Sequence, residues 1–116
     1  MIVCKRIYDP PDPHDGYRVL VDRLWPRGLT REKAAIDEWL KDVAPSNELR
    51  RWFGADAKKW PEFERRYRAE LASPDLKPRL EHLRKIAKSK RLTLLYAKKS
   101  EERNNATVLQ EVLEEG

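Results

Sequence analysis

The sequence predicts a small single-domain α/β protein, in which helices pack on a mainly parallel, Rossmann-like layered sheet. Short β-branched and aromatic runs alternate with helical patterns, which is the order that a layered α/β fold requires. The late run from Arg91 to Ala97 is almost continuously apolar after its basic start, as expected of a strand buried on both faces. The 116 residues, 40% of them hydrophobic, suit one domain with one modest core, so residues 1–116 are expected to fold as a unit.

The composition indicates which kinds of partner and location to expect. The chain carries a net charge of +5, which favours anionic partners without choosing among them. Its single cysteine, Cys4, rules out an internal disulfide and fits a reducing compartment. The apolar start is too short for a signal peptide, and no run approaches the roughly 20 apolar residues of a membrane span. We therefore expect a cytoplasmic protein that does not enter membranes.

The first third of the chain contains two predicted strands separated by a proline-rich loop. Ile2–Tyr8 and Tyr17–Val21 have the residue types of strands, and the segment from Pro10 to Gly16 lacks too many backbone donors for a regular element. A short helix is predicted over Arg31–Ile36, after the N-cap candidate Thr30.

The middle and end of the chain are predicted to be mainly helical. Asp37–Ala44 fits a short helix or a short buried strand, and we favour the strand because Pro45 and Ser46 start a new element. Ser46 is a good N-cap for a helix that Gly54 ends. The next two helices are predicted from Pro61, at the first helical position, to just before Ser73, and over Leu76–Ser89. The strand Arg91–Ala97 follows, and a last helix is predicted over Asn105–Glu114, capped by Asn104.

Parallel strands would bring three loops to one edge of the sheet. The carboxyl ends of parallel strands share an edge, and ligands of open α/β sheets bind there. The loops Asp22–Gly28, Ala44–Asn47 and Ala97–Asn104 follow strands or the ambiguous segment, so we expect them to form the site.

Arg23 and Arg27 are the leading candidates for ligand contacts. Guanidinium groups have a fork geometry that suits phosphate or carboxylate. The alternative is structural: Arg23 would pair with Asp22 or Asp37, and Arg27 would cover Trp25.

The other candidates also have a functional and a structural interpretation. Asp22 is a candidate general base, but capping its own loop is favoured. Trp25 either stacks on a ligand ring or plugs the core, and the second is slightly favoured. Ser46 begins a helix whose free N–H groups attract anions, although simple capping is its commoner role. Lys98 is the second catalytic candidate, against a solvated side chain.

The sequence offers no metal site, and no cofactor is expected. One cysteine and two separated histidines, His14 and His82, do not make a zinc cluster. Cys4 lies beside Lys5 and Arg6, which would lower the pKa of its thiol, but a small buried apolar role is favoured.

Several motifs resemble one known family over essentially the whole chain. The block VDRLWPRGL (Val21 to Leu29) is similar to the YeaO-like branch of the domain-of-unknown-function family 488. The other matching motifs, in the same order as in the family, are KRIYD (Lys5 to Asp9), WLKDVAPS (Trp39 to Ser46), ELRRWF (Glu48 to Phe53), FERRYRAEL (Phe63 to Leu71), LTLLYA (Leu92 to Ala97) and NNATVL (Asn104 to Leu109).

The resemblance implies a compact cytosolic α/β protein with Rossmann-like layering, and it supplies no activity. Its motifs concentrate on the three loops at the predicted sheet edge. The residues that it suggests for a pocket are Asp22, Arg23, Trp25, Arg27, Ser46, Arg50, Lys98 and Asn105.

Two functional hypotheses follow. The first is a site for an anionic small molecule, such as a nucleotide or a phosphorylated metabolite, with or without catalysis by Asp22 or Lys98. The second is a nucleic-acid-binding or regulatory module that uses a basic helical surface, namely Arg50, Arg51, Lys58, Lys59, Arg65, Arg66 and Arg68. Acidic residues interleave with these cations, so ordinary pairing on a solvated face competes with the second hypothesis.

Overall fold

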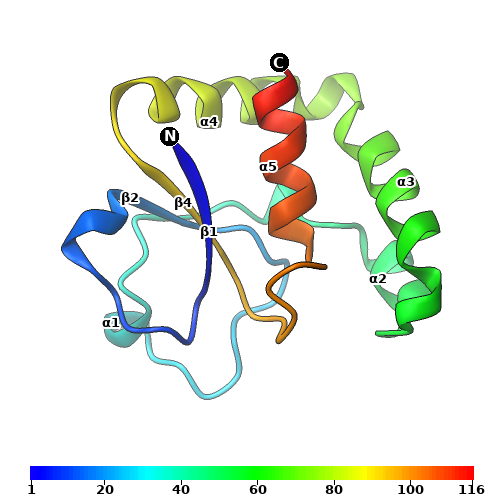
Figure 1. The fold of residues 1–116 in the computed structure, drawn as a ribbon, viewed down its shortest axis with the longest axis horizontal. Helices are drawn as coiled ribbons and strands as arrows, with labels where there is room; N and C mark the ends of the chain where they lie inside the picture. The colour runs from blue at the N-terminus through cyan, green and yellow to red at the C-terminus, as the bar shows by residue number, and fades with distance from the viewer.

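A four-stranded, entirely parallel sheet forms the centre of the molecule in the computed structural model, which describes all of residues 1–116 (Figure 1). The strands are β1 (Ile2–Arg6), β2 (Tyr17–Leu20), β3 (Glu38–Trp39) and β4 (Leu92–Tyr96), in the spatial order β1-β4-β2-β3. Cys4 and Val19 both lie opposite Leu94, which fixes the register of the three longer strands. The predicted fold class is therefore confirmed.

The central strand is β4, in which all five residues are buried. This burial explains its continuous apolar sequence, because both faces of a parallel sheet are covered. The five helices are α1 (Arg31–Ala34), α2 (Asn47–Phe53), α3 (Trp60–Leu71), α4 (Lys77–Ser89) and α5 (Asn105–Glu115). None of them is long and apolar enough to span a membrane.

Helices α4 and α5 pack on one face of the sheet, and α3 packs against α5 and α2 and closes the main core from the side (Figure 1). This core joins the inward stripe of α3, including Phe63, Tyr67 and Leu71, to Val19 and Leu94 of the sheet. The Tyr67 hydroxyl is buried and donates a hydrogen bond to the Val43 carbonyl, 2.5 Å away. This bond fixes the segment after β3 against α3.

The other face of the sheet carries a smaller apolar cluster and a buried charged network. Leu20 and Leu95 pack with Ala34 of α1, and Trp25 and Trp39 lie against this cluster. In the charged network, the Arg18 guanidinium donates to the Asp15 carboxylate and to the Ala34 and Ala35 carbonyls.

Most element boundaries lie within one or two residues of the predictions, and the differences in three segments have a structural cause. The segment from Pro10 to Gly16, predicted to hold no regular element, contains a 3₁₀ turn over Pro13–Asp15 that the Asp12 side chain caps. The predicted helix Arg31–Ile36 ends at Ala34, because Ala35 takes a positive φ of 49° and its carbonyl accepts from Arg18. The strand favoured for Asp37–Ala44 is only the two residues of β3, followed by a 3₁₀ turn over Lys41–Val43. Its pairing ends there because β2, its only neighbour, also ends at Leu20.

Candidate functional site

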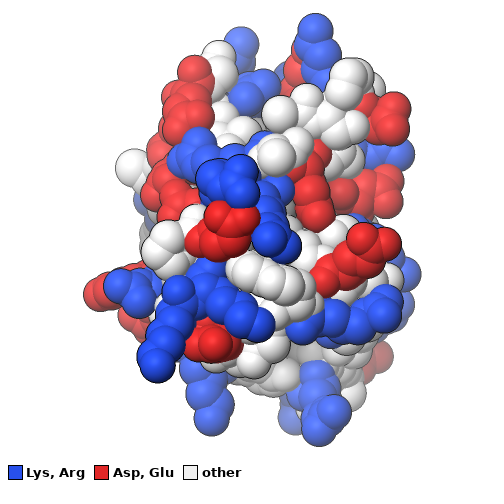
Figure 2. Space-filling model, turned by 90° about the vertical axis from the view of Figure 1, so that its right-hand side faces the viewer, with Lys and Arg blue, Asp and Glu red and all other residues white.

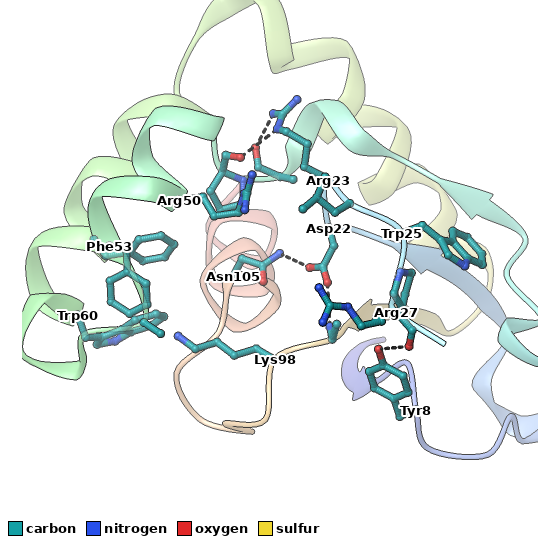
Figure 3. Close-up of a pocket in the computed structure, with 17 residues that line it drawn as sticks. Tyr8, Asp22, Arg23, Trp25, Arg27, Arg50, Phe53, Trp60, Lys98 and Asn105 are labelled. Atoms are coloured by element: carbon teal, nitrogen blue, oxygen red, sulfur yellow. Dashed lines mark hydrogen bonds between the residues drawn. The ribbon is translucent and has the colours of Figure 1, made fainter. Parts of the chain in front are cut away.

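A pocket of about 490 Å³ opens at the carboxyl ends of β2 and β4 (Figure 3). One side is the loop Asp22–Arg27 after β2, and another is the segment after β4 that includes Ala97, Lys98 and Asn105. The third side comes from the end of α2 and the start of α3, through Phe53, Trp60 and Phe63. The parallel topology therefore brings together loops that are far apart in the sequence.

Asp22 lies at the back of the pocket and is held by the segment that follows β4. Its Oδ2 accepts from the Ala97 N–H at 2.8 Å, and its Oδ1 accepts from the Asn105 side-chain amide at 3.1 Å. No cation lies within ion-pair distance of Asp22. Burial raises the pKa of this carboxyl group, and the two hydrogen bonds partly oppose the rise.

Asn105 is fixed in a defined orientation beside this carboxylate. Its Nδ2 donates to Asp22 Oδ1 and also to the Val21 carbonyl at 2.9 Å, so the amide nitrogen must face the sheet. Its Oδ1 accepts no hydrogen bond from the protein, and no buried polar side-chain atom lacks a partner. This oxygen is therefore accessible from outside.

The two arginines of the β2 loop have different roles. Arg23 donates to the Pro45 carbonyl through Nε at 3.1 Å and to the Ala44 carbonyl at 3.2 Å. Figure 3 shows its guanidinium turned away from Asp22. The side chain of Arg27 makes no hydrogen bond or ion pair, and Figure 3 shows it directed towards the middle of the pocket. Neither of the structural pairings considered for Arg23 and Arg27 is present.

None of the four cations that line the pocket has an acidic partner, and Arg23 alone is held by two backbone carbonyls. The other three are Arg27, Arg50 and Lys98. Arg50 contacts only the Asn47 side-chain oxygen, at 3.2 Å. Lys98 extends along the aromatic side, with Nζ 4.3 Å from the Phe53 ring centroid and 5.2 Å from that of Trp60. Burial lowers the pKa of its ammonium group. The pocket therefore has an excess of positive charge that the protein itself does not neutralise.

Trp25 lines the pocket but is held as a core residue of its loop, and Ser46 lies outside the pocket. The Trp25 indole donates to the Leu29 carbonyl at 2.6 Å and packs edge-on against Trp39, so it stabilises the loop as a core residue. Ser46 is not among the lining residues. Its N–H and hydroxyl both bind the Glu70 carboxylate, at 2.9 and 2.6 Å, so an internal anion already occupies the start of α2.

The structure thus brings most of the predicted site residues together and adds others. Asp22, Arg23, Trp25, Arg27, Arg50, Lys98 and Asn105 all line the pocket. Tyr8, Phe53, Trp60 and Phe63 were missed. Tyr8 follows a strand end, which was a usable signal in a parallel sheet. Trp60 and Phe63 lie on an apolar helical stripe, which indicates a core but does not reveal that its end opens onto a pocket.

Three of the seven cations of the basic helical surface considered for nucleic acid are paired with acids, and the other four are Arg50, Arg51, Lys58 and Lys59. Glu62 pairs with Arg65 and Arg66 on α3, and Arg68 pairs with Glu111 and Glu115 of α5. Figure 2 shows acidic and basic side chains interleaved over this side of the molecule, with no continuous basic band. These observations do not favour the nucleic-acid hypothesis.

Cys4 lies outside the pocket, on β1, where its thiol contacts Gln110 Oε1 at 3.1 Å. Burial, with a smaller contribution from the Glu114 charge, raises the pKa of the Cys4 thiol to about 12. At pH 8 the native thiolate fraction should therefore be about a thousandfold below that of an ordinary cysteine. We expect iodoacetamide to alkylate Cys4 slowly in the native protein and rapidly in urea, as mass spectrometry can follow. Cys4 is half-buried, and equally fast labelling in both states would contradict the raised thiol pKa.

The fold and the pocket define a class: a single-domain, parallel α/β protein with a cation-rich pocket at its strand ends. The chain belongs to the family whose model is described as the inactive DUF488-N3 subclade, which matches residues 1–116. The resemblance stated from the motifs is therefore confirmed.

Similar proteins are found in several bacteria. The chain is 47% identical over 108 residues to the uncharacterized protein YeaO of Escherichia coli K12, covering 93% of this chain and 92% of YeaO. It is 40% identical over 108 residues to the uncharacterized proteins Mb3100c of Mycobacterium bovis and Rv3073c of Mycobacterium tuberculosis, covering 93% of this chain and 89% of each relative. No solved structure matches the chain.

Proposed function

We propose that this protein binds an anionic small molecule, of the size of a nucleotide or a phosphorylated metabolite, in the pocket at the ends of β2 and β4. The observation that supports the proposal most strongly is the set of three cations, Arg27, Arg50 and Lys98, that face one pocket without an acidic partner. Exposed cations without an acidic partner, such as Arg51 and Lys99, also occur elsewhere, so the support comes from the convergence of several such cations on one pocket. An anion of a ligand would supply the missing charge.

The chemistry of the lining favours binding over catalysis. The lining contains no cysteine, serine, threonine or histidine, so it lacks the usual nucleophiles and the commonest general base. The former catalytic candidates, Asp22 and Lys98, are the two groups in the pocket best placed to exchange a proton. Asp22 accepts hydrogen bonds from two amide groups, and Lys98 contacts two aromatic rings. These contacts suit residues that shape the pocket and set its charge. The word "inactive" in the family description agrees with this proposal.

The proposal predicts that ligand affinity depends on the unpaired cations and not on charge in general. Arg27→Ala and Arg50→Ala should each weaken the binding of a phosphorylated ligand about tenfold, because each removes a charge-assisted hydrogen bond. Isothermal titration at low salt, with a panel of phosphorylated metabolites, measures the loss.

The chain offers control substitutions for these two variants. Arg51→Ala removes an exposed cation next to Arg50 and is its matched control. Lys99→Ala removes an exposed cation that also lies outside the pocket lining, and it serves as a general control for loss of positive charge. Both controls should bind as the native protein does. Equal losses in the controls would show diffuse surface attraction, and binding by none of the panel would remove the proposal.

A further inference from the structure

The pocket presents three different surfaces, and their arrangement restricts the kind of anion that it accepts. Arg27 and Arg50 supply positive charge, Asp22 and Asn105 supply hydrogen-bond acceptors, and Phe53 and Trp60 supply aromatic surface. In Figure 3 the Asp22–Asn105 pair lies between the aromatic side and Arg27. A ligand that fills the pocket must therefore satisfy all three surfaces in this order.

The acceptor pair calls for a ligand with hydroxyl or amino groups. Each carboxylate oxygen of Asp22 accepts one hydrogen bond from the protein and retains capacity for a second. Asn105 Oδ1 is accessible and accepts none. Two acceptors from neighbouring side chains match two adjacent hydroxyl groups, such as those of a ribose ring.

The same pair disfavours a bare inorganic anion. The Asp22 carboxylate has no cation partner, so its charge repels any second anion that approaches it closely in a poorly solvated pocket. The anionic group of the ligand must then lie beyond Asp22, towards Arg27, while a neutral donor occupies the centre. A phosphate separated from its diol by a short linkage meets this requirement.

The aromatic side provides a place for a planar ring. Phe53, Trp60 and Phe63 pack on one another, with ring centroids 4.7 to 6.0 Å apart, and all three line the pocket. The ammonium group of Lys98 lies against the rings of Phe53 and Trp60. Phe53 and Trp60 are 7% and 9% exposed, and Lys98 covers the part of them that faces the pocket, so a planar ligand ring packs there only in place of Lys98. Stacking on aromatic rings is tolerant of the identity of the base.

We infer that the ligand is a ribonucleoside 5′-monophosphate, bound with its base on Phe53 and Trp60, its ribose hydroxyls on Asp22 and Asn105, and its phosphate on Arg27. This inference rests on the proposed anion-binding function and narrows it to one ligand class. A mononucleotide also suits a pocket of about 490 Å³, which is within the usual size of small-molecule sites.

The test compares ligands that lack one part each, titrated calorimetrically into the native protein at low salt. The probes are AMP, GMP, CMP and UMP, together with 2′,3′-dideoxy-AMP, adenosine, ribose 5-phosphate and inorganic phosphate. At least one ribonucleotide should bind about tenfold or more tightly than each incomplete probe, because each missing part removes one of the three interactions.

The outcomes separate this inference from the broader function. Ribose 5-phosphate or inorganic phosphate that binds as tightly as every nucleotide would overturn the nucleotide assignment and leave anion binding intact. A dideoxy nucleotide that binds as well as AMP would overturn the role of Asp22 and Asn105. Binding of none of these probes would overturn both the inference and the proposed function.

One variant adds a signature that a purely structural role of Asp22 would not produce. Asp22→Asn removes the negative charge, so affinity for inorganic phosphate should rise severalfold while the preference for AMP over its dideoxy analogue weakens, because Asn105 Oδ1 still accepts. Circular dichroism and a thermal melt establish that the variant is folded. Should it not fold, the comparison of ligands on the native protein decides the question alone.

Discussion

Replacing Asp15 by alanine is expected to destabilise the protein by about 3–5 kcal/mol, because it leaves a buried arginine without its counter-ion. The Arg18 side chain is only 5% exposed and its acidic partner is Asp15. Asp15 also binds Lys5 at 3.0 Å and the Asp12 N–H at 3.0 Å, so several contacts are lost together. Urea unfolding followed by circular dichroism measures the change in the free energy of unfolding.

Two control variants show whether burial causes the effect. Glu62→Gln breaks an exposed pair with Arg65 and Arg66, and it should change the free energy of unfolding very little, because solvent screens exposed pairs. Asp15→Ala combined with Arg18→Met removes both buried charges, so the double variant should be more stable than Asp15→Ala alone. A small effect of Asp15→Ala, equal to that of Glu62→Gln, would contradict the buried ion pair.

The same pair predicts how stability depends on pH. Burial by itself raises the pKa of Asp15, but hydrogen bonds from the Asp12 N–H, Lys5 and Arg18 outweigh it, and the folded pKa lies below the ordinary value of 3.8. The contribution of this group is therefore fully present above the unfolded pKa and is lost as the pH falls through the folded pKa. As the pH falls below 3.8, native stability should fall more steeply than that of Asp15→Ala. Parallel slopes would contradict the shift.

Gly16→Ala is the second substitution with a large expected effect, about 2–6 kcal/mol of destabilisation. Gly16 has φ 68° and ψ −129°, a conformation that side chains rarely allow. A Cβ at this position would lie 2.3 Å from the Arg91 carbonyl oxygen, which accepts the Tyr17 N–H bond that starts the pairing of β2 with β4. Thermal unfolding measures the loss.

Gly28 provides the matched control for this substitution. It also has a positive φ, 77°, but a Cβ there would meet nothing within 4 Å. Gly28→Ala should therefore cost only the conformational strain, about 1–2 kcal/mol. Equal effects of the two substitutions would show that the close approach to Arg91 does not matter.

Most of the fold could be predicted because local signals agreed with the tertiary structure. Pro61 and Gly54 mark helix ends, and the apolar run after Arg91 is the central strand, as its composition indicated. The sequence of the short segment from Asp37 to Ala44 did not reveal that it contains a two-residue strand followed by a 3₁₀ turn. Its strand ends where its neighbour β2 ends, which is a property of the sheet and not of the segment.

The candidate site was predictable in its location and less so in its details. Parallel strand ends and turn residues placed Asp22, Arg27, Lys98 and Asn105 at one edge. Contacts between distant residues decide which side chains remain available to a ligand. Glu70 binds Ser46, and two loop carbonyls accept from Arg23. These partners lie more than 20 residues away in the sequence, and no local pattern reveals them.

The most direct test of ligand binding in this pocket is a two-dimensional NMR titration of the isotope-labelled protein with AMP at low salt. Saturable shifts are expected for the Ala97 and Lys98 amides, the Asn105 side-chain amide and the Arg27 and Arg50 side chains, with little change on α3 at Arg65 and Arg66. Shifts confined to α3, or changes that do not saturate anywhere, would contradict a binding pocket at the ends of β2 and β4.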